Sequence, residues 1–196
     1  MLEKLFKTGI HGDLKLMGRK SLSERDNWQG KSAARGHGAE DVFHTIMKMH
    51  LEHTDFLTVH KPKDLKGIYG ERKDKRGRVS PHGIHPEYAI TSKTSGRSIY
   101  VEIKRQRAQG NAHERACKYF TPGILNSLRQ HANQPAEIIP FWWIFTDGIA
   151  NDKYYRQEIM HWFRGIEAHV LLWKNVHDVD VVRNHFDQHI RQLLNN

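Results

Sequence analysis

Residues 98–104, Ser98-Ile99-Tyr100-Val101-Glu102-Ile103-Lys104, form a run rich in β-branched and aromatic side chains, which predicts a β-strand. Residues 84–91 predict a second strand, and the segment Ser92-Lys93-Thr94-Ser95-Gly96-Arg97 between the two is typical of a turn. Side chains two positions apart on a strand point to the same face of its sheet. Glu102 and Lys104 are therefore expected on one face and Ile103 on the other.

Further strand and helix patterns flank this pair. Residues 138–146 are almost continuously apolar, which indicates a strand covered on both faces, and residues 169–173 predict another short strand. Apolar side chains at helical spacing, with Asn111 and Thr121 as N-caps and Pro122 in a first turn, predict the helices. These helices span about residues 39–53, 111–120, 121 onward, 153–165 and 178–194. Strands that alternate with helices predict an α/β fold around a central sheet.

The domain organisation is expected to be simple. No composition shift marks a domain boundary, so the 196 residues are interpreted as a single domain, 1–196. Residues 1–37 are polar and interrupted by glycines, which indicates an N-terminal arm or lead-in. Residues 61–83 are expected to form a charged loop rich in glycine and proline.

The charge indicates an anionic partner. The chain has 31 Lys and Arg against 22 Asp and Glu, a net charge of +9. Residues 61–78 hold eight cations, Lys73 among them, and three anions, and residues 102–118 hold five cations and two anions. Two dense basic windows favour nucleic acid, although a flexible basic loop and a solvated helix face would give the same count.

Other compositional features exclude several classes of protein. No run of about 18 apolar residues is present, so no membrane span is expected, and charges among the first seven residues do not fit a secretory signal. The single cysteine, Cys117, excludes an intrachain disulfide and a cysteine-based zinc site. These features fit a protein of the reducing cytoplasm.

Two carboxylates and one ammonium group are predicted to meet on the two strands. If the strands pair as a hairpin, Glu87 lies across from Glu102, and Lys104 shares their face. This set suits Mg²⁺-assisted hydrolysis of a phosphodiester, because carboxylate oxygens hold the cation and a lysine orients the nucleophile. The acid-x-Lys pattern occurs four times, and only this one lies in a strand-like run with an acidic partner. A cross-strand ion pair on a solvated edge is the alternative. Glu40, on the first helix, is most simply a helix N-terminal acid, and an approach to the metal site through the fold is the alternative.

The following segment carries a resemblance to a known family. Glu102-Ile103-Lys104-Arg105-Gln106, followed by residues 110–123 (Gly-Asn-Ala-His-Glu-Arg-Ala-Cys-Lys-Tyr-Phe-Thr-Pro-Gly), resembles the MunI/EcoRI-like type II restriction endonucleases of the PD-(D/E)xK nuclease superfamily. The resemblance implies a mixed central sheet flanked by helices and a homodimer that acts on palindromic double-stranded DNA. It implies that Glu87, Glu102 and Lys104 form the active site. Glu87, Glu102 and the carbonyl of Ile103 are then the Mg²⁺ ligands.

The resemblance also implies which residues contact DNA. Gly110, Asn111, Ala112, Glu114 and Arg115 become the base-reading segment for an AATT core, with cleavage before the first A to leave a four-base 5′ overhang. These types suit that task, because Asn binds the N6 and N7 edge of adenine bidentately and Arg donates to a purine N7. Lys118 is expected on the phosphate backbone, and the basic loop with Lys73 is expected to contact phosphates as well.

Two departures from the family pattern leave alternatives open. Glu87 stands where the family normally has Asp after Pro, so a sequence-specific DNA-binding protein with weak or lost cleavage is the second hypothesis. The segment between Lys104 and Gly110 is short, so the outer base pair is unassigned, with Arg107 and Gln109 as its candidate readers. A nuclease of the same fold without a fixed site is a third hypothesis.

Overall fold

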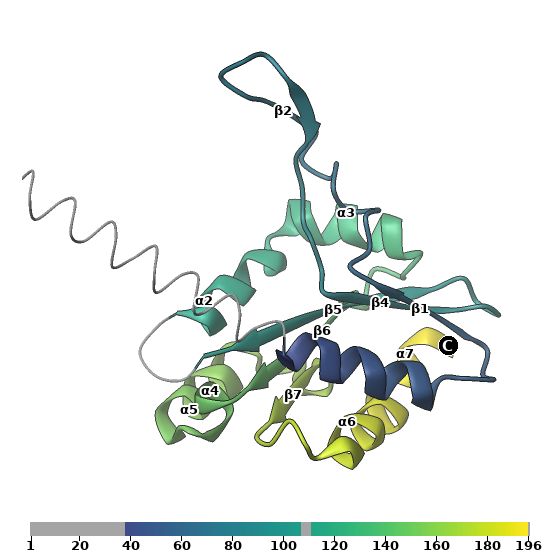
Figure 1. Ribbon diagram of the computed structural model, residues 1–196, viewed down its shortest axis with the longest axis vertical. Helices are drawn as coiled ribbons and strands as arrows, with labels where there is room; N and C mark the ends of the chain where they lie inside the picture. Colours follow the sequence, from purple (N-terminus) through teal and green to yellow (C-terminus); the bar gives the residue numbers. More distant parts are fainter. Residues whose placement is uncertain (1–37, 107–110, 196) are drawn as a thin grey trace, which may run out of the picture. The chain divides into compact units, whose positions relative to one another are not determined.

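The computed structural model describes residues 38–106 and 111–195, and the statements below concern these residues. Five strands form one sheet in the order β1-β4-β5-β6-β7 (Figure 1). Their bounds are Phe56–His60 for β1, Tyr88–Ser92 for β4, Ser98–Arg105 for β5, Phe141–Thr146 for β6 and Val170–Trp173 for β7. The strands β1, β4 and β5 pair antiparallel, whereas β5, β6 and β7 pair parallel. The expected α/β fold with a mixed central sheet is confirmed.

Helices cover both faces of this sheet. Residues 38–50 form the first helix, and the bounds of the others are Ala112–Ala116 for α2, Pro122–Ala132 for α3, Gly148–Asn151 for α4, Lys153–Trp162 for α5, Val179–His185 for α6 and Arg191–Asn195 for α7. Shorter helical turns are η1 (Cys117–Phe120), η2 (Glu167–His169) and η3 (Phe186–Ile190). In Figure 1, α2 and α3 lie on one side of the sheet, and the helix of residues 38–50 lies with α6 and α7 on the other.

Two apolar layers result, one on each face of β5. Ile99, Val101 and Ile103 belong to the layer that also contains the first helix and α6, whereas Tyr100 belongs to the layer of α2, α3 and α5. All six residues of β6 are buried, as expected for a strand covered on both faces. Because side chains alternate along β5, Glu102 points to the same layer as Tyr100.

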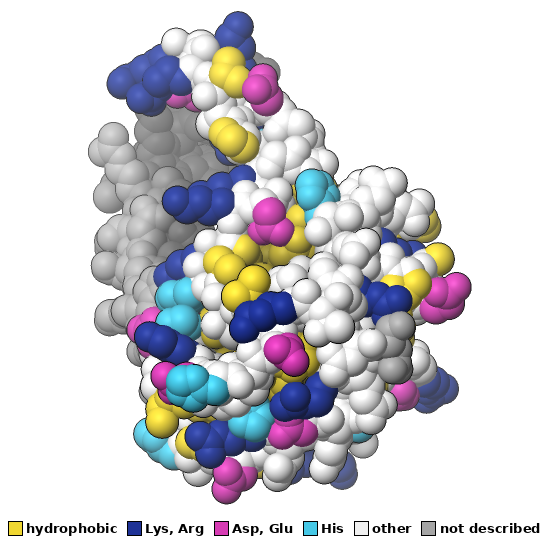
Figure 2. Space-filling model, turned by 90° about the vertical axis from the view of Figure 1, so that its right-hand side faces the viewer, with side chains coloured by type: hydrophobic (Ala, Val, Ile, Leu, Met, Phe, Trp, Pro, Cys, Tyr) yellow, Lys and Arg dark blue, Asp and Glu magenta, His cyan; other side chains and the backbone are white. Residues whose placement is uncertain are grey.

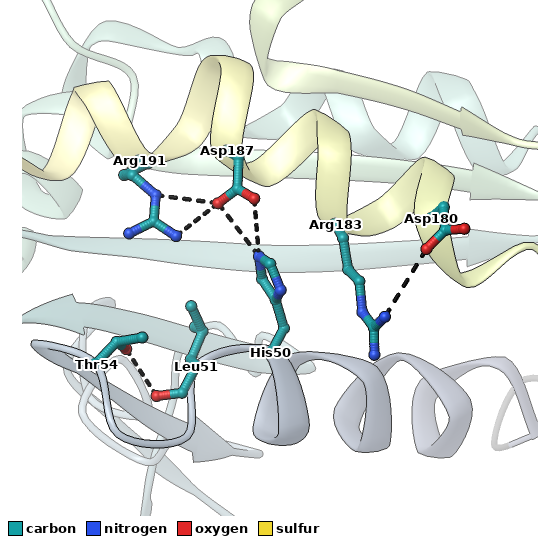
Figure 3. A network of polar contacts seen from close by, with 7 residues as sticks. All are labelled: His50, Leu51, Thr54, Asp180, Arg183, Asp187 and Arg191. Atoms are coloured by element: carbon teal, nitrogen blue, oxygen red, sulfur yellow. Dashed lines mark hydrogen bonds and ion pairs between the residues drawn. The ribbon is translucent and has the colours of Figure 1, made fainter.

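A polar network fastens the first helix to the C-terminal helices (Figure 3). The ring of His50 lies 3.1 Å from one carboxylate oxygen of Asp187, and Arg191 donates to the other at 2.6 Å. The predicted helix of residues 178–194 corresponds to α6, η3 and α7 in succession, with Asp178 accepting from the backbone of Val181 at its start.

Several sequence expectations need correction. The segment 61–83 is not only a loop: it contains a β-hairpin of β2 (Glu71–Lys73) and β3 (Val79–Pro81), which projects from the sheet in Figure 1. The carboxylate of Asp74 closes its turn by accepting from the backbone N–H groups of Arg76 and Arg78. Both strands are fully exposed, so they lack the buried, alternating side chains that reveal a strand in sequence.

Element ends and caps also differ. The strand expected from residue 84 begins at Tyr88, because Pro86 has no N–H to give to a ladder. β1 was not expected, since only one of its five residues is fully buried. Neither Asn111 nor Thr121 makes a side-chain cap, although Pro122 does lie in the first turn of α3. The helices expected to reach residues 53 and 165 end at residue 50 and at Trp162.

Candidate active site

The pairing of β4 and β5 brings the carboxyl of Glu87 near Glu102 and Lys104. The pairing ends with Tyr88 opposite Val101, and the backbone N–H of Glu87, one residue before β4, also donates to the carbonyl of Val101 at 3.0 Å. The carboxyl of Glu87 lies near enough to Glu102 and Lys104 for both to influence its pKa. Beyond Val101 the described part of β5 pairs only with β6. The sheet is therefore open beside Glu102 and Lys104, on the side where Glu87 enters β4.

Glu102 is a buried carboxylate, and among the described residues only one of its two oxygens accepts hydrogen bonds. Its side chain is only 4% exposed. Its Oε1 accepts from the ammonium of Lys104 and, at 3.2 Å, from the hydroxyl of Tyr119. Its Oε2 is buried and has no hydrogen-bond partner among the described residues. A buried carboxylate oxygen without a donor is unfavourable, so this atom suits a cation ligand.

Glu87 is partly buried, and its charge is disfavoured. Burial, the largest contribution, and the nearby carboxylates of Glu40 and Glu102 together raise the pKa of its carboxyl to about 7, against opposing contributions from Lys104 and Lys61. The ionised carboxylate is therefore disfavoured, first by burial and then by its acidic neighbours, and a bound cation would offset both effects. Glu40, interpreted from sequence as a helix N-terminal acid, therefore acts on the site electrostatically.

The donor set matches a hard divalent cation. Two carboxylates, with oxygen atoms as donors, suit Mg²⁺, which commonly keeps several water ligands and takes only one or two carboxylates from the protein. Residues 38–106 and 111–195 contain no group of three or more His, Cys, Asp and Glu side chains arranged to hold a metal. The unpartnered Oε2 of Glu102 and the crowded charge at Glu87 fit Mg²⁺, whereas nothing in this part of the chain resembles a zinc site.

The segment expected to read bases presents one polar face. Asn111, Glu114, Arg115 and Lys118 are exposed, at positions that share one side of a helix. Ala112 is only 3% exposed, and its N–H donates to the side-chain carbonyl of Gln106 at 3.0 Å. Its side chain therefore does not belong to the exposed face. Arg107, Gln109 and Gly110 lie outside the described residues.

The cations of the first basic window lie near Glu87 and on the hairpin. A cavity of about 340 Å³ is lined by Lys61, Pro62, Lys63, Lys66, His85, Pro86 and Glu87. The hairpin carries exposed cations, Lys73 among them, and Lys and Arg side chains gather at its end in Figure 2. Positive charge therefore extends from the carboxylates to the projecting hairpin.

Two residues at the site were not singled out by the sequence. Tyr119 lies in the quoted segment but had no assigned role, and Lys61 was counted only as part of the charge. Neither residue carries a local signal for its position. Tyr119 reaches Glu102 because η1 turns its side chain toward β5, and the contact joins segments that are separate in sequence.

The mixed sheet, with an acidic pair and a lysine at the open edge of β5, defines the class as the restriction-endonuclease fold. The chain belongs to the family of the type II restriction enzyme MunI, whose family model matches residues 17–195. The type II restriction enzyme MunI of Mycoplasma sp is 29% identical over 201 residues, which cover 91% of this chain and 100% of that protein. The solved structure of MunI restriction endonuclease in complex with cognate DNA matches with a TM-score of 0.69 and 27% identity, over 86% of this chain and 98% of that one.

These matches confirm the expected type II restriction endonuclease. They agree with the fold described above, because the structural match covers most of the chain at a high TM-score. Among the described residues, no helix is both long enough and apolar enough to cross a membrane.

Proposed function

We propose that the protein hydrolyses double-stranded DNA at a palindromic site with an AATT core, in a Mg²⁺-dependent reaction that cuts before the first A and leaves a four-base 5′ overhang. The observation that supports this proposal is the pairing of β4 with β5, which brings the carboxyl of Glu87 near the buried carboxylate of Glu102 and its partner Lys104. Membership of the MunI family supports it independently.

Each active-site residue has a distinct role in this proposal. Glu87, Glu102 and the carbonyl of Ile103 hold Mg²⁺, which when bound offsets charge on the reacting phosphate and lowers the pKa of bound water. Lys104 lies against Glu102, where its ammonium orients the attacking water and adds positive charge next to the phosphate. Both carboxylates must be ionised to act as ligands, so the raised pKa of Glu87 makes its protonation state important.

DNA recognition divides between two surfaces. The exposed face with Asn111, Glu114 and Arg115 supports base reading in the major groove, together with Gly110 and the backbone of Ala112. Lys118 and the hairpin cation Lys73 are proposed phosphate contacts, which add affinity without sequence information. Arg107 and Gln109 remain the candidate readers of the outer base pair.

A palindromic site requires symmetry in the protein. We therefore propose that the active form is a homodimer in which each copy cuts one strand. In this form the chain acts as one endonuclease domain, with residues 1–37 as an N-terminal arm and residues 61–83 as the DNA-contacting basic segment. The cytoplasmic location expected from composition stays a prediction.

Plasmid cleavage tests the proposal directly. The protein is incubated with plasmid DNA and Mg²⁺, with EDTA and the Glu102→Gln variant as controls, and the product ends are sequenced. We expect linear products with AATT overhangs only for the wild type with Mg²⁺. Intact DNA at every metal and salt condition would refute cleavage, and ends without AATT would refute the proposed site.

Glu87 favours one second candidate, a sequence-specific DNA-binding protein with weak or lost cleavage. With its pKa near 7, about half of the Glu87 side chains are protonated at neutral pH when no metal is bound. Gel shifts on AATT duplexes without cleavage, together with cleavage by Glu87→Asp, would establish this candidate. Equal affinity for a scrambled duplex would instead indicate a nuclease without a fixed site.

A further inference from the structure

The side chain of Tyr119 is held rigidly beside the carboxylate of Glu102. It is only 1% exposed, and its ring stacks on Phe141 with centroids 4.4 Å apart and an angle of 14° between the planes. Phe141 lies at the start of β6, the strand that pairs with Glu102 through Trp143. The ring is therefore fixed by the sheet that carries the acidic residue.

The hydroxyl of Tyr119 and the ammonium of Lys104 approach the same oxygen. Both donate to Oε1 of Glu102, the hydroxyl at 3.2 Å. The other oxygen, Oε2, is buried and has no partner among the described residues. Two donors on one oxygen restrict the rotation of the carboxylate about its Cγ–Cδ bond, because a partial rotation would lengthen or misalign both hydrogen bonds at once, and a half-turn only exchanges two equivalent oxygens.

We propose that Tyr119 is a positioning residue that, together with Lys104, holds Oε1 of Glu102 and so presents Oε2 to the divalent cation. The inference rests on the proposed role of Glu102 as a metal ligand. Hydrogen bonds to ligating carboxylates commonly set ligand orientation, and their loss typically lowers metal affinity about 10- to 100-fold. The hydroxyl itself touches neither metal nor DNA in this arrangement.

Tyr119→Phe tests the inference, because it removes the hydroxyl and keeps the stacked ring. The matched control is Tyr100→Phe, which removes another buried hydroxyl that donates to a carboxylate, that of Asp64, on the same face of β5. Each full-length variant is titrated with Mn²⁺ in the presence of an AATT duplex, and bound Mn²⁺ is measured by electron paramagnetic resonance. Thermal unfolding and duplex affinity in EDTA are measured alongside.

We expect Tyr119→Phe to weaken Mn²⁺ binding about 10-fold and to raise the Mg²⁺ concentration for half-maximal cleavage by a similar factor. Cleavage at saturating Mg²⁺ and duplex affinity in EDTA should stay near wild type, and Tyr100→Phe should leave Mn²⁺ binding unchanged. Equal loss of Mn²⁺ affinity in both variants would indicate a general structural effect and overturn the inference.

A third variant separates this inference from the proposed function. Glu102→Gln should abolish tight Mn²⁺ binding if Glu102 is a ligand. If it does so while Tyr119→Phe binds Mn²⁺ like the wild type, the positioning role is wrong and the proposed site stands. If Glu102→Gln binds Mn²⁺ as tightly as the wild type, or if the wild type itself binds no Mn²⁺, the ligand assignment fails and the inference fails with it.

Discussion

Glu87 provides a prediction that is independent of DNA and of cleavage. Burial and the neighbouring carboxylates raise its pKa from 4.5 to about 7. Between pH 4.5 and about pH 7, the folded state therefore keeps a proton on Glu87 that the unfolded state has released. The free energy of unfolding therefore falls as pH rises from about 4.5 to about 7, and the loss is complete above pH 7. Replacing Glu87 with Gln removes this penalty without removing the side chain's volume.

The size of the effect follows from the pKa difference. A shift from 4.5 to about 7 corresponds to about 3 kcal/mol at 1.36 kcal/mol per unit, and the partial exposure of Glu87 reduces the expectation to about 2 to 3 kcal/mol. In EDTA at pH 8, Glu87→Gln should therefore be more stable than the wild type by this amount. At pH 4, where both side chains are neutral in the folded state, the two proteins should differ little.

Urea unfolding followed by circular dichroism at pH 4 and pH 8 measures this difference. Glu137→Gln, at an exposed position, controls for the loss of one carboxylate from the surface. Saturating Mg²⁺ should stabilise the wild type more than Glu87→Gln, since a bound cation offsets the same charge. An equal stability difference at both pH values, or a variant less stable than wild type at pH 8, would refute the reasoning about Glu87.

Three further predictions concern recognition and the core. Arg115→Ala should reduce the preference for an AATT duplex over a scrambled duplex by about 1 to 3 kcal/mol in filter binding. Lys73→Ala should weaken binding to both duplexes equally and lower the salt dependence of binding by about one phosphate contact. Uniform loss of affinity in both variants would contradict the assignment of base-reading and phosphate-contacting residues. Burial, with a contribution from His189, lowers the pKa of His185 to about 4. As pH drops from 6.5 to about 4, His185 therefore takes up a proton in the unfolded state before it does so in the folded state, and the free energy of unfolding should fall. His185→Asn should flatten this pH dependence in urea unfolding, and an unchanged dependence would contradict the role of His185. Phe145→Ala, at a fully buried position of β6, should cost about 3 to 5 kcal/mol of unfolding free energy by the same assay, and a loss below 1 kcal/mol would show that the core repacks.

Most elements of the fold follow from local patterns. β5 and β6 are clear in sequence because their apolar runs are long, and α5 and α6 because their apolar residues recur at helical spacing. The hairpin of β2 and β3 is fully exposed and therefore has no such pattern. Its strands are held by ladder hydrogen bonds and by the turn at Asp74, and charge alone does not indicate this pairing.

Part of the candidate site was also predictable from local sequence patterns. Glu102 and Lys104 share a face by strand geometry alone, and Glu87 comes near them because its strand pairs with β5 as expected. The approach of Glu40 was only an alternative to its role as a helix N-terminal acid, and the contributions of Lys61 and Tyr119 were not expected, because each reaches the site from another element. The catalytic and DNA-contacting roles themselves stay predictions until the variants are measured.

Residue types and short-range periodicity were enough to predict the α/β class, the strand that carries Glu102 and Lys104, and the concentration of positive charge. Three features depend on the folded arrangement: the oxygen of Glu102 that lacks a hydrogen-bond partner among the described residues, the raised pKa of Glu87, and the projection of the basic segment as a hairpin. The physical reason is that burial, electrostatic coupling and strand pairing depend on distances through space, and residues far apart in the chain set those distances.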